Sequence, residues 1–509
     1  MSASREKKRR QEYLAANGGV DPKAVREAER KKAEKKTSVL YTCVAVAFAV
    51  LTAALLIKNF VLDADFMQRN RTALTIDGVD YTVADVSYYY TNAYQYEMTN
   101  GYGSYFIDTT KPLSAQSYVF DSTITWAQYF KNQAISSMQL VHAAVKAAEA
   151  EGIALNDEYR ASLDSQISYM KSQAEAKKLS YKDYLSSMFG GYITPAVYEK
   201  NLERTLLASQ YTSDYYDKLS FTDEEVQAYY EKNKNTYDIV DGGYVTISAK
   251  PETKKDENGK TIEATDEEKA AAKDSAWNTA TLILNGYKAG DDLKGLAEVY
   301  NATYTGDVDL TYVSGTAMDW LFNEARVAGD SEILFDEDAS TYYVVVFNGR
   351  QREEAPNYNI RHILITEANL NLAEGEKAGE GEVALAAQTI LDEWKRGEMT
   401  EESFAALAEK YSQDTGSVVN GGLYENVLKG QMVTQFNDWC YAEGRQAGDT
   451  GIVETTYGQH IMYFVGYSDE VYWFTACHSA LANEAYTTWE TELAKSATYE
   501  LTDNMDLIY

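Results

Sequence analysis

The chain has 509 residues, of which 45% are hydrophobic and 25% charged, and its formal net charge at pH 7 is −31. This length predicts about three domains, at about 100 to 200 residues per domain. The acidic balance excludes nucleic-acid binding, because phosphates repel a surface of like charge. The three cysteines and four histidines form no CxxC motif and no cluster at metal-ligand spacing, so we expect no metal site and no cofactor.

The N-terminal region contains a candidate membrane anchor. Residues 37–57, TSVLYTCVAVAFAVLTAALLI, carry no charge and could span about 30 Å of hydrocarbon as a helix. Residues 1–36 hold twelve Lys or Arg against six Asp or Glu, whereas the rest of the chain has a net charge of −37. The positive-inside rule therefore predicts a cytoplasmic basic tail and an extracytoplasmic remainder. A cleaved signal peptide is the alternative, but the long leader and the lack of a small-residue cleavage site favour an anchor.

Residues 71–236 have the pattern of a helical domain. It opens with a hairpin over 73–82, with an Asp77-Gly78 turn, followed by a helix from Val83. Apolar periodicity predicts three further helices, and a capping box at 222–225 predicts a fourth. The three helices are expected at 126–151, 157–178 and 196–218. Tyrosines crowd this region, for example at 88–90, and they indicate either a surface cleft for unfolded segments or ordinary packing.

An internal repeat organises the C-terminal half. Residues 319–334 align without gaps with 438–453, at an offset of 119, and eight of the sixteen positions are identical. Cys440 lies in the second copy and Cys477 near the tail; two cysteines in a large domain more often stay free than pair.

Two short apolar runs, NIRHILI at 359–365 and YGQHIMY at 457–463, each carry one histidine and predict buried strands. A lone buried histidine is usually only a satisfied core residue. The sequence between these two contains SQDTGS at 412–417, NGGL at 420–423, GQMV at 430–433 and GDTGIVET at 448–455. With these motifs in this order, residues 357–467 resemble the parvulin family of peptidyl-prolyl cis/trans isomerases.

The resemblance implies a site made of two groups of residues. The family's paired histidines, its Cys/Asp position and its active-site threonine fall on His362, His460, Asp414 and Thr455. The wall of its proline pocket falls on Leu423, Met432 and Phe436. One departure concerns Tyr424, since the family usually reads GGDLG where this chain reads GGLY. Such a site needs no nucleophile. Rotation about an amide bond has a barrier of roughly 18 to 20 kcal/mol, and the site lowers it by stabilising the twisted amide of the X-Pro bond.

The same resemblance orders the rest of the chain. Residues 237–351 are expected to form a degenerate parvulin-like domain, because the strands at 243–248 and 342–346 take the places of the histidine strands and contain no histidine. The hairpin-then-helix opening is similar to the SurA and PrsA families of secretion foldases. In such foldases the C-terminal segment, here 472–509, packs back on the N-terminal domain.

We therefore expect an α+β protein with five parts, the last two being tandem parvulin-like α/β domains. The parts are a cytoplasmic tail (1–36), a transmembrane helix (37–57), a helical SurA/PrsA-like chaperone domain (71–236, completed by 472–509), a degenerate parvulin-like domain (237–351) and a parvulin domain (357–467). The expected function is a foldase in the cell membrane of a Gram-positive-type bacterium. It would isomerise X-Pro bonds in newly exported, unfolded polypeptides and hold them. The alternatives are a chaperone that uses the parvulin fold only as a clamp, and a surface adhesin or assembly scaffold.

Overall fold

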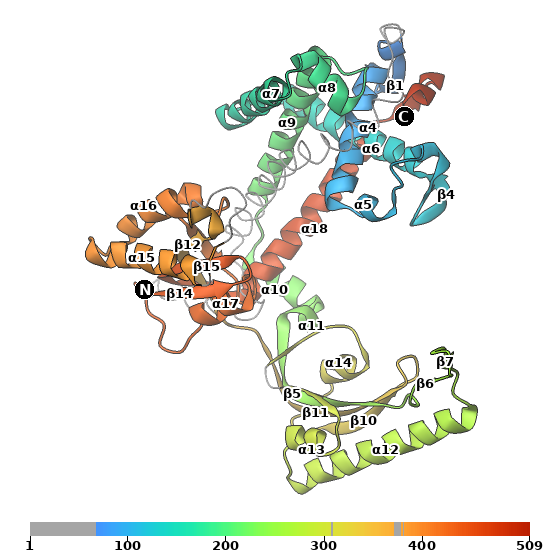
Figure 1. Ribbon diagram of the computed structural model, residues 1–509, viewed down its shortest axis with the longest axis vertical. Helices are drawn as coiled ribbons and strands as arrows, with labels where there is room; N and C mark the ends of the chain where they lie inside the picture. Colours follow the sequence, from blue (N-terminus) through green and yellow to red (C-terminus); the bar gives the residue numbers. More distant parts are fainter. Residues whose placement is uncertain (1–67, 307–308, 371–377, 380, 509) are drawn as a thin grey trace. The chain divides into compact units, whose positions relative to one another are not determined.

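The computed structural model describes residues 68–306, 309–370, 378–379 and 381–508 (Figure 1). The chain divides into two compact units. The helical unit contains the described residues up to Ser220 and those from Ala482 onward, and the sheet unit is Phe221–Leu481. No helix among these described residues is long and apolar enough to cross a membrane. The expected anchor at 37–57 and the basic tail lie outside them.

The helical unit begins with the expected hairpin. Strands β1 (Thr72–Ile76) and β2 (Val79–Thr82) pair across a turn in which Asp77 and Gly78 both have positive φ. Asp and Gly tolerate that left-handed conformation better than other residues do, which is why this dipeptide forms the turn. Strand β16 (Tyr499–Leu501), from the end of the chain, pairs with the other edge of β1. The C-terminal tail thus completes the small sheet of this unit.

The predicted helices of this unit are present: α4 starts at the expected residue, and both ends of the other three lie within two residues of the expected ones. Their bounds are α4 (Val83–Asn100), α6 (Trp126–Ala150), α7 (Asp157–Ala176) and α9 (Pro195–Lys218). Three elements were not predicted because they are short: α5 (Gly103–Phe106), α8 (Tyr181–Phe189) and the hairpin of β3 (Ser117–Tyr118) and β4 (Asp121–Thr125).

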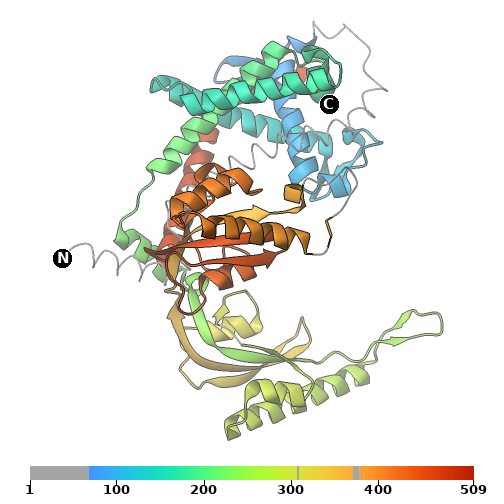
Figure 2. The same cartoon turned by 60° about the vertical axis from the view of Figure 1, so that its left-hand side comes forward.

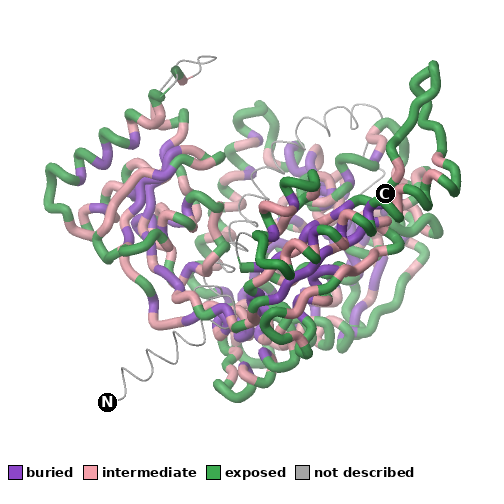
Figure 3. The backbone as a smooth tube through the Cα atoms, turned by 90° about the horizontal axis from the view of Figure 1, so that it is seen from below, coloured by how far each residue is buried: buried purple, intermediate pink, exposed green. Residues whose placement is uncertain are grey.

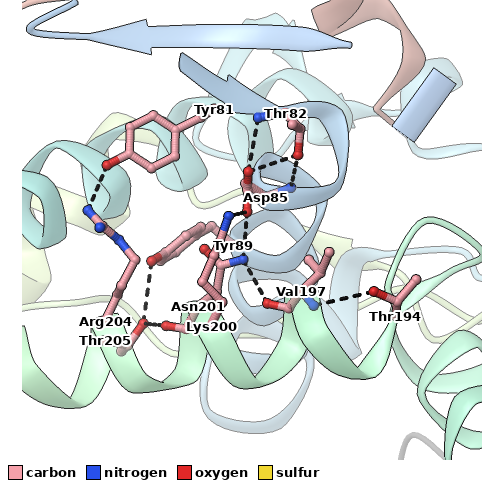
Figure 4. A network of polar contacts seen from close by, with 10 residues as sticks. All are labelled: Tyr81, Thr82, Asp85, Tyr89, Thr194, Val197, Lys200, Asn201, Arg204 and Thr205. Atoms are coloured by element: carbon pink, nitrogen blue, oxygen red, sulfur yellow. Dashed lines mark hydrogen bonds and ion pairs between the residues drawn. The ribbon is translucent and has the colours of Figure 1, made fainter. Parts of the chain in front are cut away.

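A buried carboxylate joins α4 to α9 (Figure 4). Asp85 accepts hydrogen bonds from the backbone and hydroxyl of Thr82 and from the amide of Asn201, at 2.8 to 3.0 Å, and pairs with Lys200 at 2.5 Å. Burial acts to raise the pKa of Asp85, but these partners outweigh it and the pKa is lowered. A buried charge is tolerated when it is paired in this way, so the network fixes how the two helices meet.

Burial separates the two interpretations of the clustered tyrosines. Tyr88, Tyr89 and Tyr90 are 1%, 6% and 5% exposed and belong to the core of the helical unit. The cleft hypothesis is therefore wrong for these three, because their rings pack against neighbouring helices. The three most exposed aromatic side chains of this unit, Tyr105, Phe120 and Tyr102, lie around α5 and the β3–β4 hairpin.

The sheet unit contains two sheets, each covered by helices (Figure 2). It begins with α10 (Asp223–Lys232), whose N-terminus has the predicted capping box, and α11 (Lys234–Tyr237). The strands of the first sheet are β5 (Asp238–Ser248), β8 (Thr303–Thr305), β9 (Leu310–Thr311), β10 (Ser331–Asp336) and β11 (Thr341–Arg352). Its helices are α12 (Asp266–Ala289), α13 (Leu293–Val299) and α14 (Thr316–Leu321). The segment before α12 contains a short exposed hairpin, β6 (Lys254–Lys255) and β7 (Thr261–Ile262).

The second sheet has four strands. They are β12 (Pro356–Ile365), β13 (Leu423–Val427), β14 (Thr450–Thr455) and β15 (Gly458–Val471). Helices α15 (Glu382–Arg396) and α16 (Glu401–Tyr411) pack on one face, and α17 (Thr434–Cys440) packs on the other. Helix α18 (Tyr472–Ser496) follows β15, and its residues from Ala482 belong to the helical unit. Cys440 and Cys477 are free and buried.

Both sheets share one strand order. The order is β10-β11-β5-β8 in the first sheet and β14-β15-β12-β13 in the second, and each sequence repeat covers a short helix and the edge strand after it. Buried positions concentrate in the strands and on one side of the covering helices (Figure 3). In the second sheet this alternation places Ile363 and Ile461 against α15 and α16, so their strand neighbours face α17.

Candidate active site

The two histidines of the apolar runs meet on the face of the second sheet that carries α17. His362 lies on β12 and His460 on the neighbouring strand β15, where His460 pairs with Leu364. Their side chains lie diagonally across the strand pair, and the two Nδ1 atoms are 3.0 Å apart. The side chains are buried, at 3% and 6% exposure.

The other two predicted catalytic residues complete a connected chain of polar groups. Asp414 follows α16, and its Oδ2 lies 3.0 Å from Nε2 of His362. Thr455 is the last residue of β14, and its Oγ1 lies 2.8 Å from Nε2 of His460. The order along the chain of contacts is therefore Thr455, His460, His362, Asp414.

The contacts at the two ends of this series of polar groups determine which atom donates in each of its hydrogen bonds. An ionised Asp414 can only accept, so Nε2 of His362 carries the hydrogen and Nδ1 of the same ring is an acceptor. Nδ1 of His460 must then donate to it, which leaves Nε2 of His460 to accept from the hydroxyl of Thr455. That hydroxyl also accepts from the backbone N–H of Tyr457 at 3.1 Å, and the ring nitrogen at 2.8 Å is a nearer acceptor for its hydrogen than the carbonyl oxygen of Gly458 at 3.4 Å. In this arrangement the ring hydrogens lie on Nε2 of His362 and on Nδ1 of His460.

Two of these polar groups, His460 and Asp414, have shifted pKa values. Burial, and then the proximity of His362, lower the pKa of His460 to about 4, so this ring is uncharged at neutral pH. Burial acts to raise the pKa of Asp414, but its contacts with His362, Ser417 and Tyr424 outweigh burial and hold the pKa well below its usual range. The site thus combines the negative charge of Asp414 with an uncharged ring at His460.

An apolar wall borders the histidines. Phe436 of α17 is buried, and its ring meets both imidazoles edge to face, with centroid separations of 5.5 Å to His362 and 5.4 Å to His460. Met432 is half-buried in the same cluster. The two residues thus combine an apolar surface with a small number of placed polar groups, which is typical of a small-ligand pocket.

The third residue expected in this wall, Leu423, is not among the residues of that cluster. It pairs with Arg361, whose guanidinium binds Glu401 on the α16 side of the sheet. Successive residues of a strand point to opposite faces, so Tyr424, which pairs with Ile360, faces the histidines instead. The assignment of Leu423 to the pocket wall is therefore wrong by one residue.

Two polar residues of the site were not predicted. Ser417 is fully buried, and its Oγ lies 2.5 Å from Oδ2 of Asp414 and 3.3 Å from Nε2 of His362. Tyr424 donates its hydroxyl to the same Oδ2 at 2.8 Å. The only sequence signals were the position of Ser417 three residues after Asp414 and the departure of Tyr424 from the family pattern.

Gly422 allows β13 to approach the histidine strand closely. It has a φ of +75°, and its carbonyl accepts from the backbone N–H of His362 at 2.9 Å. A Cβ added there would lie 2.2 Å from the carbonyl oxygen of His362. Only glycine fits, so the GG pair sets the distance between the segment of Asp414 and the histidines.

The remaining histidines lie outside the site. His142, in the helical unit, bonds the hydroxyl of Tyr81 at 2.9 Å, and His478 packs against Phe221. Within the described ranges, no group of three or more His, Cys, Asp or Glu side chains could hold a metal ion.

Comparison with known proteins identifies the class of this domain. Residues 342–465 match the family of PPIC-type PPIase domains (Rotamase_3). The match begins within β11 and ends in β15, so it includes all four predicted catalytic residues. The match confirms the predicted resemblance of this region to the parvulin-type isomerases.

Several named relatives share this region. Foldase protein PrsA 1 of Listeria innocua is 32% identical over 123 residues, which cover 22% of this chain and 42% of the relative. Foldase protein PrsA 3 of Bacillus cereus is 32% identical over 108 residues, 21% of this chain and 30% of the relative. Chaperone SurA of Pseudomonas syringae pv. tomato is 30% identical over 116 residues, 23% of this chain and 24% of the relative. The chain thus spans less than half the length of the relatives it matches, and its resemblance to PrsA- and SurA-like foldases is confirmed through this domain.

Solved structures of PrsA proteins also match. The structure from Bacillus subtilis covers 75% of this chain and 90% of its own, at 12% identity and a TM-score of 0.30. The one from Bacillus anthracis covers 28% and 58%, at 22% identity and a TM-score of 0.19.

Proposed function

We propose that this protein is a membrane-anchored extracytoplasmic foldase that catalyses cis/trans isomerisation of X-Pro bonds and holds unfolded chains. The observation that carries the proposal is the chain of contacts from Thr455 to Asp414, closed beside the apolar ring of Phe436. The first sheet is proposed to be a degenerate parvulin-like domain that keeps the strand order of the second.

The arrangement suits a reaction in which no bond is broken. As an amide twists out of plane, resonance is lost and charge moves from the carbonyl oxygen back toward nitrogen. The proline ring would lie against Met432 and Phe436, and the directed hydrogen-bond chain would present fixed dipoles to the peptide group. Dipoles that are already oriented stabilise the twisted amide without reorganisation. No residue is assigned as a base, because the two imidazoles and the carboxylate are joined by hydrogen bonds and the geometry singles out none of them.

The experiment that tests isomerisation is cis/trans exchange of a proline-containing test peptide, followed by NMR with the full chain. We expect catalysis by the wild type and at least about a tenfold loss in His460→Ala, because the ring that links Thr455 to His362 in the dipole chain is removed. His478→Ala is the matched control, because it removes another buried histidine of the same unit away from the site. Equal rates for wild type and His460→Ala would leave only the alternative, a clamp without catalysis.

The proposed holding function is supported by an exposed aromatic patch on the helical unit. Tyr105, Phe120, Tyr102 and Phe106 are 82%, 62%, 59% and 50% exposed. Tyr102 and Phe120 lie edge to face at 5.5 Å, so the patch joins α5 to the β3–β4 hairpin. Exposed apolar surface of this kind marks interaction sites, and residues 96–125 contain few charges in an otherwise acidic chain.

Holding is tested by the ability of the full chain to prevent aggregation of a reduced, unfolded protein. Replacing Tyr105 and Phe120 by Ser should weaken this protection without changing peptide isomerisation. As a control, the same replacement at Trp277 and Val299, which are exposed at 47% and 75% in the sheet unit, should leave protection unchanged. Equal protection by all variants would contradict the assignment of holding to this patch.

The proposed anchor and localisation rest on residues 1–57 of the sequence. The apolar run and its basic leader support an N-terminus in the cytoplasm and a body outside it. Protease treatment of intact cells should digest the body and spare a membrane-bound N-terminal fragment. A body that remains protected until the cells are lysed would contradict this topology.

A further inference from the structure

Tyr424 occupies the position where the sequence departs from the family pattern, and the structure gives it a defined place. Its ring lies 5.4 Å from that of His362, tilted by 31°, in the cluster that contains Phe436 and Met432. Its hydroxyl reaches Oδ2 of Asp414 at 2.8 Å. One side chain therefore forms part of the pocket wall and also reaches the carboxylate behind the histidines.

Three hydrogens converge on the same carboxylate oxygen. Oδ2 of Asp414 receives the hydroxyl of Ser417 at 2.5 Å, that of Tyr424 at 2.8 Å and the Nε2 hydrogen of His362 at 3.0 Å. The other oxygen accepts from the backbone N–H of Gly416 at 3.2 Å. A carboxylate with this many donors acts only as an acceptor, and its plane is fixed by contacts from several directions.

We propose that Tyr424 is a positioning residue that, with Ser417, holds Asp414 as a fixed acceptor and thereby sets the tautomers of both histidines. This inference rests on the proposed isomerase function and adds a residue to it. Without the Tyr424 hydroxyl, Asp414 loses one of its three Oδ2 donors and can rotate about its side-chain bonds. The Nε2–H tautomer of His362 is then favoured less strongly. In a fraction of the molecules, the hydrogen bond between His362 and His460 reverses its donor and acceptor.

The small number of histidines makes this measurable. The chain has four, so labelling with ¹⁵N-histidine gives four imidazoles whose nitrogen shifts report tautomer and charge. In the wild type we expect His362 as the Nε2–H form and His460 as the Nδ1–H form. Tyr424→Phe keeps the ring and removes the hydroxyl, and it should move the shifts of both rings toward a mixture. His142 and His478 should not move, and they show that the variant is folded.

The matched control is Tyr230→Phe. Tyr230 is also a buried tyrosine of the sheet unit, and it donates to the carboxylate of Asp238 at 2.6 Å, away from the site. The Tyr230→Phe variant should leave the nitrogen shifts of His362 and His460 and the isomerisation rate unchanged. Tyr424→Phe should lower kcat by about threefold to tenfold, the effect of one lost hydrogen bond, and leave KM nearly unchanged. In the pH–rate profile of Tyr424→Phe, the fall in rate on the acid side should also begin at a higher pH, because Asp414 loses a hydrogen-bond donor to its charged form.

Unchanged shifts of His362 and His460 in Tyr424→Phe would overturn the inference, as would equal shift changes in Tyr230→Phe. If Tyr424→Phe does not fold, Ser417→Ala removes another donor to the same oxygen and must produce the same mixture of tautomers. A wild type without isomerase activity would end the proposed function, whereas the nitrogen shifts would still decide the role of Tyr424.

Discussion

The two sheets of the sheet unit share a strand order and differ at the positions of the histidines. His460 pairs with Val453 of β14, and in the first sheet the aligned residue, Leu334, pairs with Tyr343. The next strand then places Tyr244 at the position of His362. The first sheet thus carries a tyrosine pair, with ring centroids 5.9 Å apart, where the second carries a histidine pair at 5.2 Å.

The segment that leads into the edge strand differs as well. Residues 300–302 connect α13 to β8, whereas the longer segment 412–422 connects α16 to β13 and carries Asp414 and Ser417. The strands of both sheets thus form a common scaffold. In the second sheet, the segment 412–422 adds the carboxylate acceptor that orients the histidine pair. A paired ring on the sheet is not sufficient for a directed chain of hydrogen bonds.

The largest expected effect concerns the connection of the second sheet. Gly422→Ala should destabilise the sheet unit by about 3 kcal/mol or more, because a left-handed residue gains a Cβ that meets the backbone of His362. Isomerisation should be lost with it. Urea unfolding, followed by hydrogen exchange of peptides from β12 and β15, measures the change.

Gly430→Ala controls for the conformation alone. Gly430 has a φ of +80°, close to that of Gly422, but a Cβ there meets nothing within 4 Å. This variant should cost only about 1 to 2 kcal/mol, the penalty for an L-residue in that region. Equal costs at the two positions would mean that the close approach to the histidine strand does not constrain the site.

The second prediction concerns the effect of pH on stability through His460, whose position in the first sheet is occupied by Tyr343. The pKa of His460 is lowered from 6.5 to about 4 in the folded chain, so acid favours the unfolded state, which takes up a proton more readily. The free energy of unfolding should fall as pH drops from about 6.5 toward 4, by about 3 kcal/mol in total for this group. Asp414 has a depressed pKa, so its contribution is present above about pH 3.9 and is lost only in stronger acid.

His460→Gln should reduce this slope between pH 6.5 and 5, measured by urea unfolding at each pH with hydrogen exchange on β12 and β15. The matched change in the first sheet, Tyr343→Gln, should leave the slope as it is, because tyrosine does not titrate in that window. A slope that His460→Gln leaves intact would show that the ring is not held neutral by burial.

Local sequence signals predicted much of this molecule. The Asp77-Gly78 hairpin, the capping box at 222–225 and the two histidine strands follow from turn chemistry and periodicity within a few residues. Motif order then placed His362, His460, Asp414 and Thr455 in one site, and the structure brings them into one chain of contacts.

The features that were not predicted depend on strand register and on contacts between residues that are far apart in the sequence. Leu423 and Tyr424 exchange faces with a slip of one residue in β13, and no periodicity fixes a strand this short. The contacts of Ser417 form only when the connection folds over the histidine strand. The burial of Tyr88 depends on rings from other helices, such as Phe189 and Tyr198, which local composition does not reveal.

A third prediction isolates the acceptor itself. Asp414→Asn keeps the shape of the side chain and removes its charge, so the His362 tautomer is no longer imposed and isomerisation should fall by about tenfold. Because Tyr424 acts through this carboxylate, Tyr424→Phe should add almost nothing to the effect of Asp414→Asn. Peptide exchange rates of the two single variants and the double variant measure the coupling. Additive losses would mean that Tyr424 contributes to catalysis by another route, such as its ring alone.

The smallest expected effect is the most direct test of the comparison. Tyr244→His with Tyr343→His would give the first sheet the same histidine pair on the same scaffold. We expect less than about a twofold change in peptide exchange, because the connection 300–302 carries no counterpart of Asp414 to select one tautomer and fix the dipole. The measurement is best made in the His460→Ala background, where the second sheet contributes little. A clear gain there would show that two neighbouring imidazoles on this sheet are sufficient, and that the connection with Asp414 and Ser417 only improves them.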